Sequence, residues 1–349
     1  MKICFVTATM AGGGAERVIA NLSNELVKRG HFVTILLTAE YIIDYELNPK
    51  VEVIQVSTKT ENNSKKRVQR ILALRKWLKQ NRDAYIISMP TDTNIFVLLA
   101  SLFLNVNITI SERNDPNEYE RKKLRDIVYV LAKKVVFQTP DAKQYFGKRI
   151  QKSSTIIPNP ISDSIQKIEN SKREKCIVAV GRLEEQKNHK LLIDSFEMLL
   201  KDYPEYELYI YGKGSLRDEL TEYIQRNNLQ ERVFLAGFSK NVWEEAAHCT
   251  MYVLSSDYEG MPNSLMEAMA VGIAVVATDC PIGGPQLLIE HEKNGLLVPV
   301  GDKEKLYLAM RRLVEDEELS QSLARNAATI SDVLSVQNIC DKWIDYIKG

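Results

Sequence analysis

Two cations and two glutamates in the second half of the chain have the types and spacing for phosphate and sugar chemistry. Arg182 and Lys187 lie between a β-rich run and a helical pattern, and Glu259 and Glu267 stand eight positions apart, one before a helix and one inside it. Such cations can neutralise a departing diphosphate, and such carboxylates can accept hydrogen bonds from sugar hydroxyls. A surface Arg or Lys alone is usually only solvated, so the combination favours a site.

The helix that contains the second glutamate supplies a further component. Pro262 suits a first helical turn, and the N–H groups that follow it have no partner within the helix. These N–H groups belong to Asn263, Ser264 and Leu265. A helix N-terminus of this kind suits a diphosphate. Glu267 then lies one turn further in, where it can accept from a ribose diol, and Glu259 in the preceding loop can reach a hexose hydroxyl.

A glycine-rich loop in the first half is a second candidate phosphate site. Gly13 and Gly14 stand between a strand pattern and a helical pattern, so backbone N–H groups can approach an anion without a Cβ in the way. A dinucleotide fingerprint needs G-x-G-x-x-G, but Arg17 occupies the place of its third glycine, which disfavours a nicotinamide cofactor. A tight turn without a ligand is the alternative.

The elements that must position these residues alternate along the whole chain, since short β-rich runs are separated by longer helical patterns. This alternation is typical of parallel sheets covered by helices. The expected strands are 3–6, 32–37, 51–56, 85–88, 108–111, 135–138, 154–157, 176–180, 207–211, 233–236, 251–254 and 274–277. We therefore predict two doubly wound, Rossmann-like α/β domains at 1–163 and 172–330, with a C-terminal helix in 334–349 able to pack back on the first.

Composition agrees with a globular α/β protein of two domains. The 349 residues include 46 basic and 46 acidic side chains and are 45% hydrophobic, which excludes disordered, collagen-like and disulfide-scaffold classes. Residues 1–165 hold 25 Lys/Arg against 16 Asp/Glu, and the remainder hold 21 against 30. The two halves are therefore expected to differ in their partners.

The spacing of cysteine, histidine and apolar residues excludes several further classes. The five cysteines form no C-x-x-C pair and the four histidines have no metal spacing, so we expect no disulfide framework and no metal. No signal-peptide pattern is present. The longest near-apolar stretch, 95–104, is well short of the ~18 to 20 residues that span a bilayer. A cytoplasmic protein with at most peripheral membrane contact is expected.

Together these motifs resemble the retaining glycosyltransferases of family 4, over essentially the whole chain. The likeness rests on Gly-Gly-Gly-Ala-Glu-Arg at 12–17, Gly-Arg at 181–182, Lys-Asn at 187–188, Gly-Lys-Gly at 212–214, the segment 259–267 and Asn-Gly-Leu-Leu-Val-Pro at 294–299. The resemblance implies the GT-B fold, in which two Rossmann-like domains face each other across a cleft. It also implies transfer of a hexose or N-acetylhexosamine from a nucleotide-diphosphate sugar, UDP-linked by default, without a metal or other cofactor.

The resemblance also implies roles for individual residues of the second half. Arg182, Lys187 and Glu259 would act at the reacting centre, and Glu267 would bind the donor. Backbone groups at two more positions would meet the base of the nucleotide. These are Gly237 and Phe238. Removing Arg182 or Lys187 is expected to lower turnover and to leave the fold intact.

In the first half the resemblance is accompanied by departures. Gly13 and Gly14 would face the donor phosphates or the acceptor. Many relatives carry Glu-His near the transferred sugar, whereas this chain has Glu112-Arg113. An arginine has too high a pKa to act as a base at neutral pH, so Arg113 is expected to act electrostatically or in acceptor binding. Gln286 replaces a common glutamate, and both changes leave the sugar undetermined.

Bacterial enzymes that assemble capsule, lipopolysaccharide O-antigen or lipid-linked oligosaccharides are the most similar, which implies a glycan or polyprenyl-diphosphate-linked acceptor. Residues 65–82 contain eight cations and no acid, with Val68, Ile71, Leu72 and Leu78 near helical spacing. This pattern predicts a basic amphipathic helix that can lie on an anionic membrane at the inner face. A helix packed on its own core is the alternative, and no nucleic-acid motif accompanies the charge.

Two other functions stay open at this point. An epimerase on the same fold would convert a nucleotide sugar with no acceptor present, and a non-catalytic binder would only recognise it. A purely structural role is disfavoured because Arg182, Lys187, Glu259 and Glu267 occur together.

Overall fold

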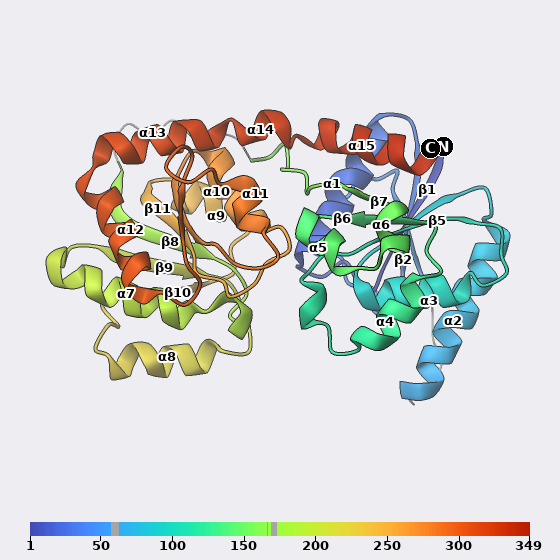
Figure 1. Cartoon of the computed structure of the whole chain (residues 1–349), viewed down its shortest axis with the longest axis horizontal. Coiled ribbons are helices and arrows are strands. Elements are labelled where there is room, and N and C mark those ends of the chain that lie inside the picture. Colours follow the sequence, from blue (N-terminus) through green and yellow to red (C-terminus); the bar gives the residue numbers. More distant parts are fainter. Residues whose placement is uncertain (57–62, 166, 169–172) are drawn as a thin grey trace. The chain divides into compact units, whose positions relative to one another are not determined.

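The chain forms two compact α/β units in a computed structural model, which describes residues 1–56, 63–165, 167–168 and 173–349, with backbone alone for 63–66. The first unit comprises residues 1–162 and 334–349, and the second comprises 163–333. Each unit is built on one parallel sheet flanked by helices (Figure 1). The predicted pair of doubly wound α/β domains is confirmed.

The first unit contains a seven-stranded parallel sheet in the order β3-β2-β1-β4-β5-β6-β7. Its strands are β1 (Lys2–Thr7), β2 (Phe32–Leu37), β3 (Glu52–Gln55), β4 (Tyr85–Ser88), β5 (Asn107–Ser111), β6 (Lys134–Phe137) and β7 (Ser154–Ile156). The strand order reverses between β1 and β4. In open parallel sheets, ligands bind outside the carboxyl ends of the strands at such a reversal, so the loops after β1, β4 and β5 are well placed for a site.

The helices of the first unit include one from the end of the chain. They are α1 (Gly14–Lys28), α2 (Asn63–Gln80), α3 (Thr91–Ala100), α4 (Lys122–Tyr129), α5 (Pro140–Tyr145), α6 (Lys148–Lys152) and α15 (Val336–Lys348). Helix α15 packs against α1, and an ion pair joins Arg29 to Asp341. The two termini therefore lie close together (Figure 1).

The second unit contains a six-stranded parallel sheet in the order β10-β9-β8-β11-β12-β13. Its strands are β8 (Glu174–Val180), β9 (Glu207–Tyr211), β10 (Val233–Gly237), β11 (Cys249–Leu254), β12 (Ala274–Thr278) and β13 (Leu296–Val298). Its helices are α7 (His189–Asp202), α8 (Arg217–Arg226), α9 (Val242–Ala246), α10 (Asn263–Val271), α11 (Gly284–Leu288), α12 (Lys303–Glu315), α13 (Glu317–Ala328) and α14 (Ile330–Val333). Here the order reverses between β8 and β11.

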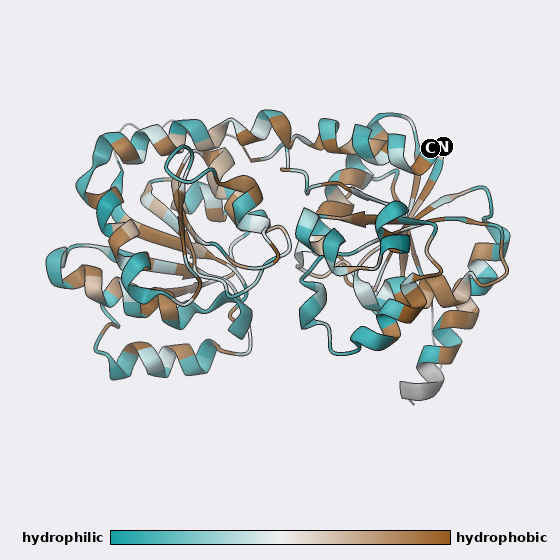
Figure 2. Cartoon of the chain, in the orientation of Figure 1, coloured by the Kyte–Doolittle hydropathy of each residue, from teal (hydrophilic) through white to brown (hydrophobic). Residues whose placement is uncertain are grey.

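Apolar residues concentrate on the strands and alternate with polar residues along the helices (Figure 2). In the second unit, Ile177 of β8 and Met251 of β11 pack in one core with Phe196 of α7 and Met310 of α12, and all four are fully buried. Strand β8 is apolar from Cys176 onward, and β11 is buried along its whole length, as expected for strands covered on both faces. Because the core holds these strands in place, it also fixes the positions of their carboxyl ends and of the loops that follow them.

Two cysteines that no spacing rule linked form a disulfide between neighbouring strands. Cys176 lies in β8 and Cys249 in β11, and they are 73 residues apart in the sequence. The sequence analysis predicted no disulfide framework and did not foresee this single pair, because its proximity arises from strand pairing. With His248 the two sulfurs form a cluster of potential metal ligands within 4.8 Å, which the sequence spacing also did not predict. The disulfide leaves neither sulfur as a thiolate, so we assign no metal to it.

Helix α2 forms where the basic helix was predicted, but part of its apolar side faces the core. Leu74 and Leu78 are fully buried, and Arg75 donates to the carbonyl oxygens of Ala100 and Leu102 at 2.9 and 2.7 Å. Among its described side chains, Val68 and Leu72 are the exposed large apolar ones. Of the helices in the described ranges, none has both the length and the hydropathy needed to cross a bilayer.

Substitution of Trp343 would measure how much α15 contributes to the stability of the first unit. Its side chain is 2% exposed, and truncation of a buried tryptophan leaves a cavity that costs about 3–5 kcal/mol. We expect Trp343→Ala to lower the free energy of unfolding by this amount in denaturant titrations. The exposed neighbour Lys342→Ala is the control, and an equal loss in both variants would contradict a packed α15.

Candidate active site

The loop after β8 is fixed by the close approach of the loop after β9. A Cβ on Gly212 would collide with the carbonyl group of Gly181, and one on Gly214 would collide with that of Leu183. The Leu183 N–H also donates to the carbonyl oxygen of Lys213 at 2.9 Å. Only glycine fits at these two positions without displacing backbone. The contact holds residues 181–183 at the carboxyl edge of the sheet.

A buried ion pair connects this loop to the one after β11. Lys187 Nζ contacts Glu259 Oε1, with side chains that are 13% and 7% exposed. The same carboxylate oxygen accepts from Ser256 Oγ at 2.7 Å, and the Glu259 N–H donates to the carbonyl oxygen of Pro281 at 2.7 Å. A carboxylate removed from water needs such partners. Three loops therefore converge on Glu259.

Arg182 lies at the border of a surface hollow beside this pair. Its Nη2 donates to Gln186 Oε1 at 3.0 Å, and Gln186 Nε2 donates to the carbonyl oxygen of Tyr258 at 2.9 Å. The hollow has a volume of about 340 Å³ and is also lined by Ser215. The backbone and Gln186 thus orient an exposed guanidinium, which leaves it available to an anion.

The start of α10 lies in the same segment as Glu259. Pro262 is its N-cap residue and has no side-chain acceptor for the first N–H groups. Ser264 Oγ bonds with the hydroxyl of Tyr252 at 2.8 Å, and the Leu265 side chain is fully buried. These two positions can therefore contribute backbone groups to a ligand.

Glu267 lies one turn into α10 and is 4% exposed. Its Oε2 accepts from Trp243 Nε1 of α9 at 2.8 Å, which fixes the rotamer of the carboxylate. The sequence patterns therefore named Glu259 and Glu267 but not the groups that orient them. Ser256 lies three residues before Glu259, so its closeness in sequence could have indicated the contact. Trp243 is far from Glu267 in the sequence, and no pattern indicated that contact.

Gly237 and Phe238 lie where β10 ends. Gly237 has a φ of +77°, a conformation that favours glycine, and its carbonyl oxygen accepts from the N–H of Gly212 at 2.7 Å. Phe238 is 53% exposed, and Lys213 Nζ lies 5.3 Å from the centre of its ring. An exposed aromatic ring beside backbone polar groups can accommodate a flat heterocycle.

His189 supports the Arg182 loop from inside the domain. The ring is 5% exposed, and Nε2 donates to the carbonyl oxygen of Arg182 at 3.1 Å. Burial lowers the pKa of His189 to about 4, so the ring is neutral at physiological pH. The ring therefore packs in the interior of the second unit.

In the first unit, Arg113 stands at the carboxyl end of β5. Its three guanidinium nitrogens are buried, and no described residue forms a hydrogen bond with them. Burial lowers the pKa of Arg113 to about 10, so the side chain still carries its charge at neutral pH. A buried cation without a hydrogen-bond partner is costly unless an anion pairs with it.

Glu112, the residue before Arg113, is oriented by a buried network. Its carboxylate accepts from Thr91 Oγ1 at 2.5 Å and from the Tyr129 hydroxyl at 2.9 Å, and Tyr129 also accepts from Asn94 Nδ2 at 2.9 Å. Burial raises the pKa of Glu112. The network holds the end of β5 and therefore the backbone of Arg113.

The glycine loop begins α1 and is stabilised from the β2–β3 connection. The Gly12 N–H donates to Asp44 Oδ2 at 2.8 Å, and the Tyr45 hydroxyl donates to the carbonyl oxygen of Gly13 at 2.6 Å. Gly13 is the N-cap residue and Gly14 the first residue of α1. The first unit thus places Gly13, Gly14 and Arg113 in loops at the same sheet edge, on either side of the order reversal.

Comparisons with known proteins identify the family of this chain. Residues 161–329 match the family described as glycosyl transferases group 1, and residues 12–164 match glycosyltransferase family 4. A Campylobacter jejuni N-acetylgalactosamine-N,N'-diacetylbacillosaminyl-diphospho-undecaprenol 4-alpha-N-acetylgalactosaminyltransferase is 28% identical, with 100% of both chains covered.

Two more matches extend the comparison. An uncharacterized glycosyltransferase of Methanocaldococcus jannaschii is 27% identical over 81% of this chain and 83% of its own. Among solved structures, Anabaena HepE in complex with UDP has a TM-score of 0.84 at 20% identity, with 100% of both chains covered. At this identity the structural likeness bears on the fold, and it agrees with the two parallel-sheet domains.

The Lys187–Glu259 pair makes the site sensitive to loss of either charge. Lys187→Met leaves a buried carboxylate without its cation, which costs about 3–5 kcal/mol, so the sequence-based expectation of an intact fold changes for this residue. We expect the double variant Lys187→Met/Glu259→Gln to recover most of the loss. We would measure the free energy of unfolding in denaturant for the wild type, both single variants and the double variant, which gives the coupling energy between the two side chains. Additive losses of unfolding energy would show that they are independent.

The buried His189 ring predicts that stability falls in mild acid. The unfolded chain takes up a proton near the ordinary pKa of about 6.5, whereas the folded chain does so only near a pKa of about 4. Stability is therefore full above about pH 6.5 and decreases as the pH falls toward 4, by up to about 3 kcal/mol from this ring. His189→Gln keeps a donor for the Arg182 carbonyl, and its unfolding energy should fall less between neutral pH and pH 4; identical decreases would refute the assignment.

Proposed function

We propose that this chain, which belongs to the family 4 glycosyltransferases, transfers a hexose or N-acetylhexosamine from a nucleotide-diphosphate sugar to a glycan or lipid-linked glycan. The second unit would bind the donor and the first unit the acceptor. The observation that carries the proposal is the buried Lys187–Glu259 pair at the sheet edge, in the same loop segment that leads into α10 and Glu267. The product would belong to a surface polysaccharide or glycoconjugate of a bacterium.

The donor site follows from the geometry of α10 and its neighbours. The diphosphate would lie against the N–H groups at the start of α10, with Arg182 at its side. Glu267, oriented by Trp243, would accept hydrogen bonds from the ribose hydroxyls, and Phe238 would border the base. A uridine nucleotide is favoured because the similar Anabaena structure holds UDP.

The chemistry proposed at this site needs no metal ion. The bond between the anomeric carbon and the phosphate oxygen breaks, and the diphosphate leaves with the electron pair. Arg182, Lys187 and the N-terminus of α10 would stabilise the charge that develops on it. The acceptor hydroxyl then attacks from the same face and passes its proton to the leaving phosphate, so the anomeric configuration is retained. Glu259 would hold Lys187 in place and contact a sugar hydroxyl.

The acceptor would be bound by the first unit. Arg113 brings to the sheet edge a buried cation that has no hydrogen-bond partner among the described residues, with Glu16 and Glu112 near enough to attract it. Gly13 and Gly14 lie at the start of a helix at the same edge. An acceptor phosphate would pair with this cation. The Campylobacter relative is named for an undecaprenyl-diphosphate-linked acceptor, which favours a polyprenyl-diphosphate glycan here. Such an acceptor would place the protein at the cytoplasmic face of the membrane, in peripheral contact with anionic lipid.

Binding of a panel of UDP- and GDP-sugars by calorimetry tests the donor site. We expect one UDP-sugar to bind and Glu267→Ala to weaken it by about 10- to 100-fold, because charge-assisted hydrogen bonds contribute about 1.5–3 kcal/mol each. The exposed Glu318→Ala variant on α13 is the control. No binding of any donor by the wild type, or equal binding by Glu267→Ala, would refute the proposed donor site.

A further inference from the structure

Helix α4 presents a row of large apolar side chains to solvent. Leu124, Ile127 and Leu131, at and just beyond the helix, are 46%, 71% and 45% exposed. Their spacing of three and four residues places them on one side. The opposite side is buried and consists of Arg125, Val128 and Tyr129. The helix therefore has one side buried in the core and another, apolar side that the core leaves exposed.

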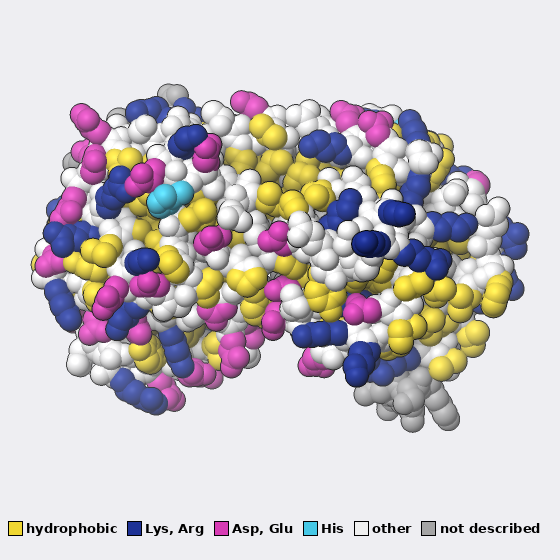
Figure 3. Space-filling model, in the orientation of Figure 1, with side chains coloured by type: hydrophobic (Ala, Val, Ile, Leu, Met, Phe, Trp, Pro, Cys, Tyr) yellow, Lys and Arg dark blue, Asp and Glu magenta, His cyan; other side chains and the backbone are white. Residues whose placement is uncertain are grey.

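Cations border this outward row, which we call the α4 surface (Leu124, Ile127, Val130 and Leu131). Lys122 and Lys123 precede it and Lys133 follows it, and all three are exposed. The one acid in the α4 sequence, Asp126, is paired with Arg125 at 2.8 Å. Two exposed acids, Glu118 and Glu120, also precede the lysines, so the border is mixed in charge with cations in excess. Figure 3 shows Lys and Arg side chains beside apolar and acidic ones over this part of the first unit.

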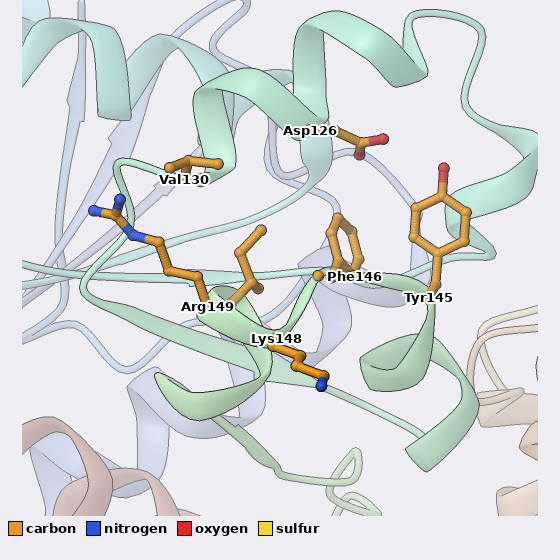
Figure 4. Close-up of a pocket in the computed structure, with 8 residues that line it drawn as sticks. Asp126, Val130, Tyr145, Phe146, Lys148 and Arg149 are labelled. Atoms are coloured by element: carbon orange, nitrogen blue, oxygen red, sulfur yellow. The ribbon is translucent and has the colours of Figure 1, made fainter.

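A pocket extends the α4 surface toward α6. It has a volume of about 290 Å³ and is lined by Val130, Phe146 and Ile150 together with Lys148 and Arg149. Figure 4 shows Val130 and Asp126 reaching it from α4, with Phe146 and Arg149 on the segment opposite. The lining thus combines apolar walls with two cations and one acid, Asp126, and it can accommodate an acyl chain next to a phosphate.

Helix α2, which the sequence favoured for membrane contact, exposes fewer large apolar side chains among its described residues than the α4 surface does. Its Leu74 and Leu78 are buried, Arg75 is bonded to backbone carbonyls after α3, and Arg70 lies over the ring of Phe96 at 5.3 Å. Helix α3 packs against both α2 and α4, so the three helices lie together (Figure 1). The largest outward apolar row among them belongs to α4.

We propose that the α4 surface binds an anionic phospholipid membrane, with its apolar row in the interfacial region and its lysines on lipid headgroups. An exposed apolar row is costly in water unless a partner covers it. The apolar side chains suit the interfacial region of a bilayer, and the cations that border them suit its negatively charged headgroups. The inference deepens the proposed function, because it rests on an acceptor that is held in a membrane.

Vesicle co-sedimentation of the full chain tests this surface directly. The wild type should bind phosphatidylcholine vesicles that contain phosphatidylglycerol and bind poorly to phosphatidylcholine alone. Ile127→Glu puts a charge at the centre of the row and should weaken binding at least about tenfold. Leu308→Glu is the matched control, since Leu308 lies on α12 of the second unit and is 52% exposed. Thermal unfolding of each variant checks that it folds.

Three outcomes would overturn the proposal: equal vesicle binding by Ile127→Glu and the wild type, wild-type binding that does not depend on anionic lipid, or loss of binding in Leu72→Glu of α2 but not in Ile127→Glu. A change from dimer to monomer in Ile127→Glu, with unchanged vesicle binding, would assign the surface to a second copy of the chain instead.

A separate readout distinguishes this inference from the proposed function. Transfer to a water-soluble, short-chain acceptor needs no membrane, so Ile127→Glu should keep wild-type turnover there while losing activity on acceptor embedded in anionic vesicles. Loss on both acceptors would overturn the membrane role of α4. Inactivity of the wild type on both, with intact vesicle binding, would refute the proposed function and leave the surface standing.

Discussion

The second unit depends on one buried electrostatic contact, between Lys187 and Glu259. Each residue comes from a loop that leaves a central strand, β8 or β11, on either side of the order reversal. A carboxylate at 7% exposure is tolerable only because a cation and the Ser256 hydroxyl pair with it. The pair therefore ties the loops together and sets the path of the chain into α10. The contact that stabilises this edge is also the one on which the proposed donor site rests.

The first unit has the opposite arrangement at the matching edge. There the carboxylate of Glu112 is fully satisfied by Thr91 and Tyr129, whereas the neighbouring Arg113 guanidinium is buried without a hydrogen-bond partner in the described chain. The second unit thus has a cation that contacts a carboxylate directly, and the first has a buried cation that carboxylates attract without a hydrogen bond. This difference is the physical basis for the proposal that the two units bind different substrates.

On the exterior of the first unit, packing also decides which charged and apolar side chains remain exposed. Basic residues concentrated in the sequence of α2 suggested a membrane face, but charge density alone does not reveal which side chains remain outside. Packing against α3 engages Arg70 and Arg75, while α4, whose composition is less extreme, keeps Ile127 at 71% exposure. Packing therefore decides which helix side stays exposed, and so which surface the proposed membrane contact would use.

The sequence by itself determined the alternation of strands and helices, the family, and the residue types at the edge, because periodicity and motif spacing are local properties. Arg182, Lys187, Glu259 and Glu267 were all named in this way. Strand β13 is too short for its pattern to stand out. Tertiary structure alone decided that Trp243 orients Glu267, that Cys176 meets Cys249, and that Arg113 is buried. These facts depend on contacts between segments far apart in the chain, and only the folded sheet brings such segments together.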